Sequence, residues 1–332
     1  MFFIFYIYNM TSCLVRYSGF SLKDFCELEE QFYPNQSIYT KRAFSSALRR
    51  IELSYGDKLE NLNLEFLSNV DLVEKKLIEK DYKLNSIIST ISCLIKTLKI
   101  LDAPLSITDA YLKKLNNLMA KRIDNEKKQQ MTEREAENWV EWCDLEKKVE
   151  EEALKYIDNN NIDFAAFKDF LCLSLFVLET PVRLGNYINC RVVSNDNNLN
   201  DKCNYLVINN DSYEFIFNKY KTAKTLGKIK KKVNCEILKK LLDTYFEKYN
   251  TEKQIFLVSS NKKPMTQLAL MNSLKKITKK LFDKEFSVNL IRHSYISYFL
   301  NTDPSLIDKI QIAREMGQKY RITQQDLYRR LY

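Results

Sequence analysis

Residues 290–295 read Leu-Ile-Arg-His-Ser-Tyr, residues 316–318 read Met-Gly-Gln, and Tyr328 follows ten residues later. The first stretch lies in an apolar helical pattern, Val288–Leu300, which places an arginine and a histidine next to each other on one helix. A glycine turn comes next, and Thr323 is a suitable cap for one more helix that contains the tyrosine. These residues are candidates for a functional site near the end of the chain.

Further candidate residues lie upstream. Thr180–Asn186 reads Thr-Pro-Val-Arg-Leu-Gly-Asn and follows Phe164–Leu178, which is apolar on nearly all sides and typical of a buried helix. Lys219–Thr222 reads Lys-Tyr-Lys-Thr and stands before a tight turn. Strand character between the two arginines is found in three segments, Asn204–Ile208, Tyr213–Lys221 and Lys228–Asn234. The sequence therefore predicts a mainly α fold with a small antiparallel β-sheet.

Composition agrees with this fold class. The chain has 332 residues, with 5 Gly and 5 Pro, which favours two mostly helical domains with few loops. Its 52 Lys and Arg against 43 Asp and Glu give a net charge of +9, which favours a polyanionic partner, although an ordinary solvated surface is the alternative.

Composition also excludes several classes of protein. The eight cysteines are scattered without a Cys-x-x-Cys pair, which favours reduced thiols and a reducing compartment. His293 is the single histidine, so a site of several histidines around a metal is impossible and no metal or cofactor is expected. No segment reaches about 18 uninterrupted apolar residues, so the chain is expected to be soluble, without contact to a membrane.

Four segments are predicted along the chain. Residues 1–9 are an apolar extension, residues 10–123 a helical domain, residues 124–131 a polar linker and residues 132–332 a second domain. The helices predicted in the first domain are Lys41–Leu53, Leu72–Glu79, Leu84–Leu101 and Ser106–Ile123. The capping-box spacing of Thr132 and Glu135 opens the second domain with a helix that runs through Trp139 and Trp142.

The combination resembles the tyrosine recombinases, or phage-type integrases, over about residues 130–332. Arg183 matches the family's first arginine, Lys221 the hairpin lysine, Arg292 the second arginine and Tyr328 the nucleophile. The resemblance implies a two-domain clamp, in which a helical core-binding domain and an α+β catalytic domain hold double-stranded DNA. It also implies strand exchange through a 3′-phosphotyrosine without metal or ATP, in a homo-tetramer on DNA.

Three positions depart from the family pattern. Asn289 stands where the family has His or Lys, Gln318 where it has His or Trp, and Asn186 where it has an acidic residue. Amides donate hydrogen bonds to phosphate but cannot act as general acids or bases. Asn289 and Gln318 are therefore expected to bind the reacting phosphate, and His293 is expected to orient the site.

Contacts to DNA are expected mostly at phosphates. The predicted hairpin contacts are Lys219, Lys221, Lys224 and Lys228, and weaker candidates in the first domain are Arg42, Arg49 and Arg50. Residues 219–232 hold seven lysines and no acid, a pattern that is also typical of an edge strand protected by charge.

Each piece has an alternative interpretation when it is taken alone. Arg183 can be a helix-end cap, Arg292 can be structural, and Tyr328 is one of 20 tyrosines, with Tyr320 and Tyr332 on either side. Two other functions also stay open, a non-catalytic DNA-binding derivative of the fold and a nickase of the type IB topoisomerase or telomere-resolving kind.

Residue usage rich in Lys, Asn, Ile and Tyr resembles that of integrases from large DNA viruses and their mobile elements. Such a protein can act in the nucleus or in the cytoplasm of a host, and the sequence does not decide between these two places.

Overall fold

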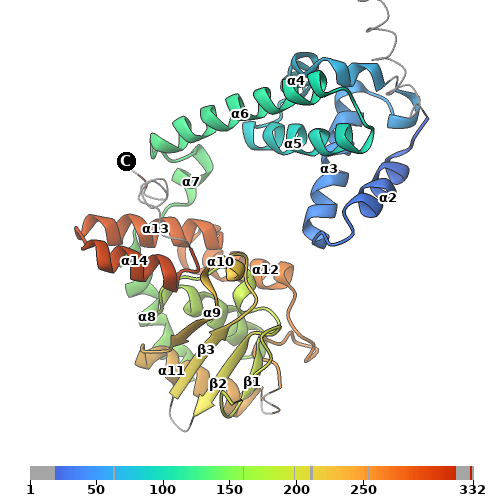
Figure 1. The fold of residues 1–332 in the computed structure, drawn as a ribbon. Coiled ribbons are helices and arrows are strands. Elements are labelled where there is room, and N and C mark those ends of the chain that lie inside the picture. The colour runs from blue at the N-terminus through green and yellow to red at the C-terminus, as the bar shows by residue number, and fades with distance from the viewer. Residues whose placement is uncertain are drawn as a thin grey trace, which may run out of the picture. The chain divides into compact units, whose positions relative to one another are not determined.

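The computed structural model describes residues 19–62, 64–159, 161–197, 199–209, 212–250, 252, 254–318 and 330. The chain divides into two compact units, Met1–Lys128 and Gln129–Tyr332, and each is described by itself (Figure 1).

The described part of the first unit is helical. Its elements are α2 (Leu22–Phe32), α3 (Ile38–Tyr55), η1 (Leu59–Asn61), η2 (Leu64–Ser68), α4 (Val70–Glu79), α5 (Leu84–Ile100) and α6 (Leu105–Lys127). Helix α5 contacts α2, α3, α4 and α6, and its Ile91, Leu94 and Leu98 are almost completely buried. Burial of this apolar stripe on all sides holds the helices together.

The four helices predicted in this unit are confirmed as α3, α4, α5 and α6. Pro104 stands at the N-cap of α6, because it cannot continue the preceding helix. Helix α6 runs on to Lys127, so the first part of the polar stretch 124–131 is helical. The ion pair between Arg122 and Glu126, which are one helical turn apart, supports this last turn.

The second unit carries helices, one small sheet and the candidate site. Its elements are α7 (Glu133–Asn138), α8 (Trp142–Asp158), α9 (Phe164–Val177), η3 (Leu184–Asn186), β1 (Arg191–Val193), β2 (Tyr205–Asn209), β3 (Ser212–Phe217), α10 (Ala223–Leu226), β4 (Ile229–Lys232), α11 (Glu236–Thr244), the π-helical turn η4 (Tyr245–Tyr249), α12 (Gln267–Phe282), α13 (Val288–Asn301) and α14 (Leu306–Glu315).

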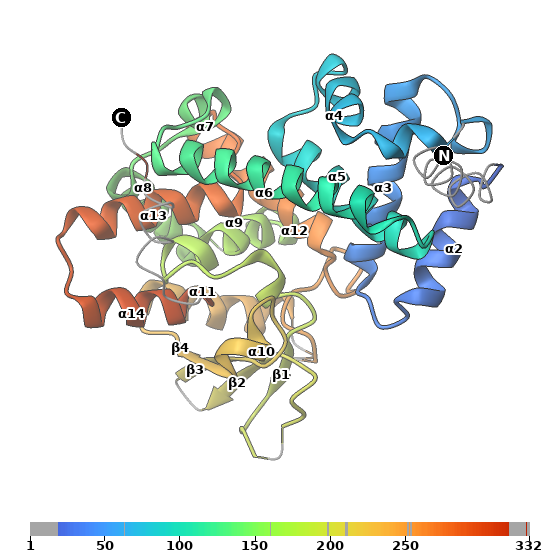
Figure 2. The same ribbon diagram turned by 45° about the horizontal axis from the view of Figure 1, so that its top comes forward.

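Helix α9 is the centre of this unit. It contacts α8, α11, α12 and α13, and every residue from Asp169 to Val177 is buried (Figure 2). The predicted buried helix at Phe164–Leu178 is confirmed. Tyr187, which lies beyond the end of α9, donates a hydrogen bond from its hydroxyl to the Leu175 carbonyl at 3.1 Å and packs edge-on against Phe176.

The sheet has the order β1-β2-β3-β4 and is mixed. Strands β2, β3 and β4 pair antiparallel, whereas β1 pairs parallel with β2. The mainly α class with a small sheet is confirmed. A fully antiparallel sheet is wrong, because the short strand β1 was not predicted.

Three further differences concern individual helices and strands. Strand β3 ends at Phe217 and not at Lys221, because the side-chain oxygen of Asn204 accepts hydrogen bonds from the backbone N–H groups of Asn218 and Lys219. The helix predicted through both tryptophans is interrupted at residues 139–141 and becomes α7 and α8. Helix α14 was not predicted, although Ser305 and Asp308 form a capping box at its start.

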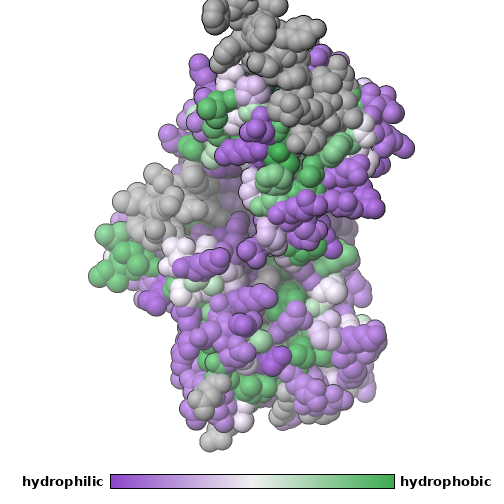
Figure 3. All heavy atoms as spheres, turned by 45° about the vertical axis from the view of Figure 1, so that its right-hand side comes forward, coloured by the Kyte–Doolittle hydropathy of each residue, from purple (hydrophilic) through white to green (hydrophobic). Residues whose placement is uncertain are grey.

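Among the described residues, no helix combines the length and the apolar character that a membrane crossing requires. Hydrophilic side chains cover much of the face in Figure 3.

We predict that Asn204→Asp destabilises the second unit by about 3 kcal/mol, because a buried carboxylate replaces an amide that donates to the carbonyls of Asn186 and Lys219. Trp139 and Trp142 are the two tryptophans of the chain, so urea unfolding followed by tryptophan fluorescence reports on this unit alone. Asn218→Ala, which removes one hydrogen bond to the Cys203 carbonyl, is the control and should cost about 1 kcal/mol. Equal losses for the two variants would contradict the role of Asn204.

Candidate functional site

Arg292 is the central residue of the candidate site. Ser287 caps the helix that carries it, and the side chain of Arg292 is 0% exposed. Its Nη1 donates to the Pro181 carbonyl at 2.9 Å and to the Met316 carbonyl at 3.2 Å. One buried guanidinium therefore joins α13 to the segment before Arg183 and to the turn before Gln318.

The segment that presents Arg183 is held from several sides. The Thr180 hydroxyl donates to Oε2 of Glu315 at 2.9 Å, and the Thr180 carbonyl accepts a hydrogen bond from Nζ of Lys231. Val182 is fully buried, while Arg183 is partly exposed. The Nε of Arg183 is buried and has no hydrogen-bond partner in the part of the chain that the structure describes. A donor held without a partner is available to an anion.

The glycine turn after α14 presents Gln318. Gly317 has φ +66°, which favours glycine, and a Cβ at this position would lie 3.5 Å from the Tyr220 ring. The backbone N–H of Gln318 donates to the Ala313 carbonyl at 2.8 Å. Its side chain is 4% exposed, and its Nε2 has no hydrogen-bond partner among the described residues. This buried amide is a second donor that an anion can use.

The turn between β3 and β4 lies against the glycine turn. The Thr222 hydroxyl donates to the Gly317 carbonyl at 2.7 Å, and the Tyr220 hydroxyl closes the β3–β4 turn on the Gly227 carbonyl at 2.7 Å. Lys221 lies between these two anchored residues, and its own side chain is exposed. The turn is thus fixed at the backbone while the lysine side chain can move.

Asn204 ties this turn to the arginine segment. Its amide nitrogen donates to the Asn186 carbonyl at 2.9 Å and to the Lys219 carbonyl at 3.0 Å. Asn186 is itself buried, and its Nδ2 has no partner in the described residues. Segments about Arg183, Lys221, Arg292 and Gln318 are therefore connected through named hydrogen bonds.

Two more predicted residues lie on α13, one three residues before Arg292 and one directly after it. Asn289 is exposed and lines a hollow together with Thr132, Glu135 and Ser287. His293 is partly exposed, and its charge is one of the influences that lower the pKa of Glu135. Burial alone would raise the pKa of Glu135, but a hydrogen bond from the Thr132 backbone and the charge of Arg330 outweigh it.

The candidate nucleophile lies outside the described residues, as do Tyr320, Thr323 and Tyr332. Arg330 is described and is anchored in the second unit. Its backbone N–H donates to the Ser297 hydroxyl at 2.8 Å, and its Nη2 lies 3.3 Å from Oε1 of Glu135.

The predicted DNA contacts differ in exposure. Lys219, Lys224 and Lys228 are exposed in the β3–β4 turn, and Arg42 and Arg49 are exposed on α3. Arg50 is partly buried, with Nε 2.7 Å from the Thr90 hydroxyl and Nη2 3.5 Å from the Ser89 hydroxyl. Its guanidinium therefore has contacts within its own unit.

Sequence reasoning missed Lys231 as a residue of this site. It lies on β4 with a side chain that is 5% exposed, and its Nζ is 3.9 Å from Oε2 of Glu179. Burial lowers the pKa of Lys231 to about 8, against the influence of Glu179. The sequence signal for it was the alternation along the strand, which places Lys231 on the same face as the apolar Ile229 and opposite to Lys230 and Lys232.

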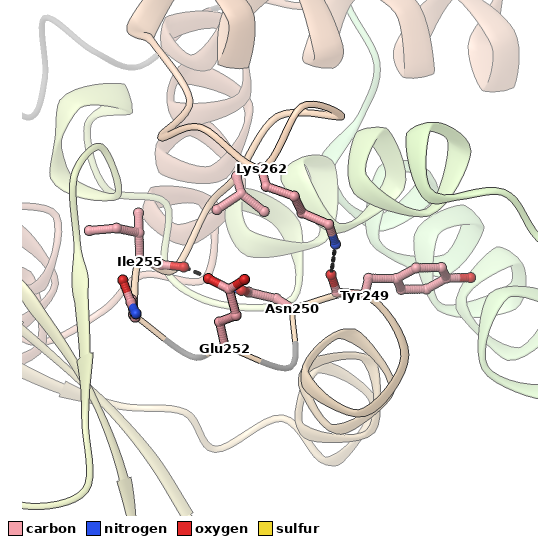
Figure 4. A pocket seen from close by; sticks show the side chains of 7 residues that line it. Tyr249, Asn250, Glu252, Ile255 and Lys262 are labelled. Carbon is pink, nitrogen blue, oxygen red and sulfur yellow. Dashed lines mark hydrogen bonds between the residues drawn. The ribbon is translucent and has the colours of Figure 1, made fainter.

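A shallow hollow elsewhere in the unit is separate from this constellation. It is lined by residues between Tyr249 and Lys262, where Lys262 donates to the Tyr249 carbonyl (Figure 4). Within the described residues, no three His, Cys, Asp or Glu side chains gather in a way that could hold a metal ion.

No family model and no curated protein matches the chain. Several solved structures are similar to it, and two of them are recombinases. The crystal structure of XerA recombinase is 13% identical over 94% of this chain and 94% of that chain, with a TM-score of 0.39. The XerH site-specific recombinase bound to difH substrate, in a pre-cleavage complex, is 13% identical over 91% of this chain and 78% of that chain, with a TM-score of 0.47. Neither likeness carries the functional argument, which rests on the site itself.

We predict a pH-dependent difference in stability between the protein and Lys231→Met. Between pH 8 and 10.5 the unfolded chain holds the Lys231 proton and the folded chain does not, so the cost of burying this charge is present below pH 8 and is relieved as the pH rises. The protein should therefore gain up to about 3 kcal/mol relative to the variant over this window, in urea unfolding followed by tryptophan fluorescence.

Lys230→Met is the matched control for this measurement. Lys230 is exposed on the same strand and its hydrogen bond to Asp196 raises its pKa, so the difference between the protein and this variant should not change from pH 8 to pH 10. A constant difference for Lys231→Met as well would show that Lys231 keeps its proton throughout this range.

Proposed function

We propose that the protein is a tyrosine recombinase, which cleaves and rejoins DNA strands at specific sites through a 3′-phosphotyrosine. One observation carries the proposal: the buried guanidinium of Arg292 holds the two segments that present Arg183 and Gln318. Both of these residues keep a buried N–H donor without a partner in the described part of the chain. The transition state of a reacting phosphodiester carries negative charge, which cationic and amide N–H donors stabilise. Here such donors come from three distant parts of the sequence.

The chemistry assigns a role to each residue. Tyr328 attacks the scissile phosphate, so that a bond forms between its hydroxyl oxygen and phosphorus while the bond to the 5′-oxygen breaks. The proton of the tyrosine hydroxyl passes to solvent water. Arg183 and Arg292 stabilise the negative charge that gathers on the non-bridging oxygens. Lys221, on its anchored turn, donates a proton to the departing 5′-oxygen. Because the phosphotyrosine keeps the energy of the broken bond, the strand can be rejoined without ATP.

The amides have supporting roles in this scheme. Gln318 donates a hydrogen bond from Nε2 to a phosphate oxygen, and Asn289 does the same from one turn before Arg292 on α13. His293, the residue after Arg292 on α13, is assigned the role of orienting the site. Neither amide exchanges a proton in the reaction, so proton transfer to the 5′-oxygen rests on Lys221.

DNA binding in this proposal is mostly a matter of phosphate contacts. The exposed Lys219, Lys224 and Lys228 contact the backbone on one side, together with Lys221. The exposed Arg42 and Arg49 of the first unit add further contacts, so that both units hold the duplex as a clamp. Exchange of strands between two duplexes requires four protomers, one for each strand that is cut.

A non-cleaving DNA-binding protein is the second candidate. It is favoured by Asn289 and Gln318, which replace groups that could ionise. This candidate shares the binding surface with the first and differs only in the chemistry, so covalent capture separates the two.

We predict that nicked duplexes with the sequences that flank the protein's own gene form a covalent adduct on Tyr328. The adduct should resist denaturation, and mass spectrometry should find the phosphate on the peptide that contains this tyrosine. Tyr328→Phe should abolish the adduct, while Tyr320→Phe and Tyr332→Phe, the matched controls, should keep it.

Three other results would each contradict a different part of the proposal. An adduct on Tyr320 or Tyr332 would keep the reaction and replace the nucleophile. Binding that weakens with salt but yields no adduct, on the flanking sequences and on a pool of random duplexes, would favour the non-cleaving protein. Absence of binding would remove DNA as the substrate.

A further inference from the structure

The short segment Glu179–Pro181, which leads to Arg183, is tied to the rest of the unit at every residue. Oε1 of Glu179 accepts hydrogen bonds from the backbone N–H groups of Asn234 at 2.7 Å and Cys235 at 3.1 Å. Thr180 is bound through its hydroxyl and its carbonyl, and Pro181 through its carbonyl. The direction of the Arg183 side chain therefore depends on these contacts.

Two buried cations supply two of the contacts. Arg292 binds the Pro181 carbonyl, and Lys231 binds the preceding carbonyl, that of Thr180. Lys231 also pairs with Glu179, whose side chain is 11% exposed. One lysine therefore contacts two successive residues of the segment, and Arg292 contacts the next residue along.

A buried lysine is a costly way to stabilise a fold. Removal of a charge from water costs several kcal/mol, and a well-packed apolar side chain is often as stable or more stable in its place. On β4 the neighbours Lys230 and Lys232 are exposed, as is usual for lysine. Lys231 therefore has a use other than stability at this position.

We propose that Lys231 is a positioning residue, which holds the Glu179–Pro181 segment so that Arg183 meets the scissile phosphate. Its charge also adds to the positive potential behind Arg292. The positioning part follows from the contacts of the segment alone, and the effect on strand cleavage rests on the proposed function.

Because Lys231 holds the segment Glu179–Pro181 as a cation, this contact depends on pH. The charged groups that face it are Glu179 and Glu315, which raise its pKa, and Arg292, which lowers it, while burial dominates and brings the pKa to about 8. Above this pH the amine loses its attraction to Glu179, and the segment loses an ionic contact. Cleavage should therefore slow as the pH rises through about 8.

Hydrogen exchange of the backbone tests the positioning part without any reaction. At pH 7, amides in the peptide that spans residues 179–187 should exchange at least about 10-fold faster in Lys231→Met than in the protein, because a hydrogen bond from a charged donor is lost. Lys230→Met is the matched control and should leave this peptide unchanged. Exchange in Lys231→Met equal to that of the protein would overturn the proposal.

Cleavage rates measured against pH test the part that concerns the reaction. Lys231→Met should form adduct about 100-fold more slowly at pH 7 and should lack the fall near pH 8, since a small misplacement of a reacting group has an effect of this size. Glu179→Gln keeps an oxygen for the two backbone N–H groups but removes the charge, so it should move the fall to lower pH. Lys230→Met should follow the protein.

The contact of Lys231 with the segment and its effect on strand cleavage can be tested separately. If the protein itself forms no adduct, the proposed function fails, and hydrogen exchange still decides whether Lys231 holds the segment. If the protein forms adduct and neither Lys231→Met nor Glu179→Gln changes its rate or its pH dependence, the positioning role is wrong while the recombinase stands.

Discussion

Burial of the Arg292 guanidinium is the interaction on which the second unit depends. A charge that is 0% exposed must be compensated, and the compensation comes from the carbonyls of Pro181 and Met316. These carbonyls lie 111 and 24 residues from Arg292 along the chain. One buried cation therefore contacts two segments that lie far from it along the chain.

The same constraint explains why polar groups in this region form a connected set. The Glu315 carboxylate accepts from Thr180, and Thr222 donates to the Gly317 carbonyl. The Asn204 amide donates to the carbonyls of Asn186 and Lys219. Several of these hydrogen bonds involve buried groups, such as the carbonyls of Asn186 and Gly317, and buried polar groups are usually hydrogen-bonded. Donors without a partner in the described residues include those on Arg183, Asn186 and Gln318, and Arg183 and Gln318 are candidates for phosphate binding.

Local patterns in the sequence predicted much of this fold and named the segments around Arg183, Arg292 and Gln318, which hydrogen bonds connect in the structure. In α9 and in the amphipathic helices α3 to α6, the spacing of apolar residues involves only residues close together in the chain. These helices can therefore be predicted from the sequence alone. The parallel strand β1 is three residues long and depends on its partner β2, and the exit of the chain after Phe217 depends on the distant Asn204. Lys231 looked like one of seven surface lysines, because its partners Glu179 and Thr180 lie about fifty residues upstream.

The measurement that tests this account most directly is the cleavage of a methylphosphonate duplex, in which the scissile phosphate carries no charge, by the protein and by Arg183→Ala. If Arg183 serves to neutralise that charge, its loss should slow cleavage of the ordinary phosphodiester about 100- to 1,000-fold. On the neutral substrate the difference between protein and variant should fall below about 10-fold, because there is no charge left to stabilise. An equal loss on both substrates would contradict the account, since Arg183 would then act on the fold and not on the phosphate.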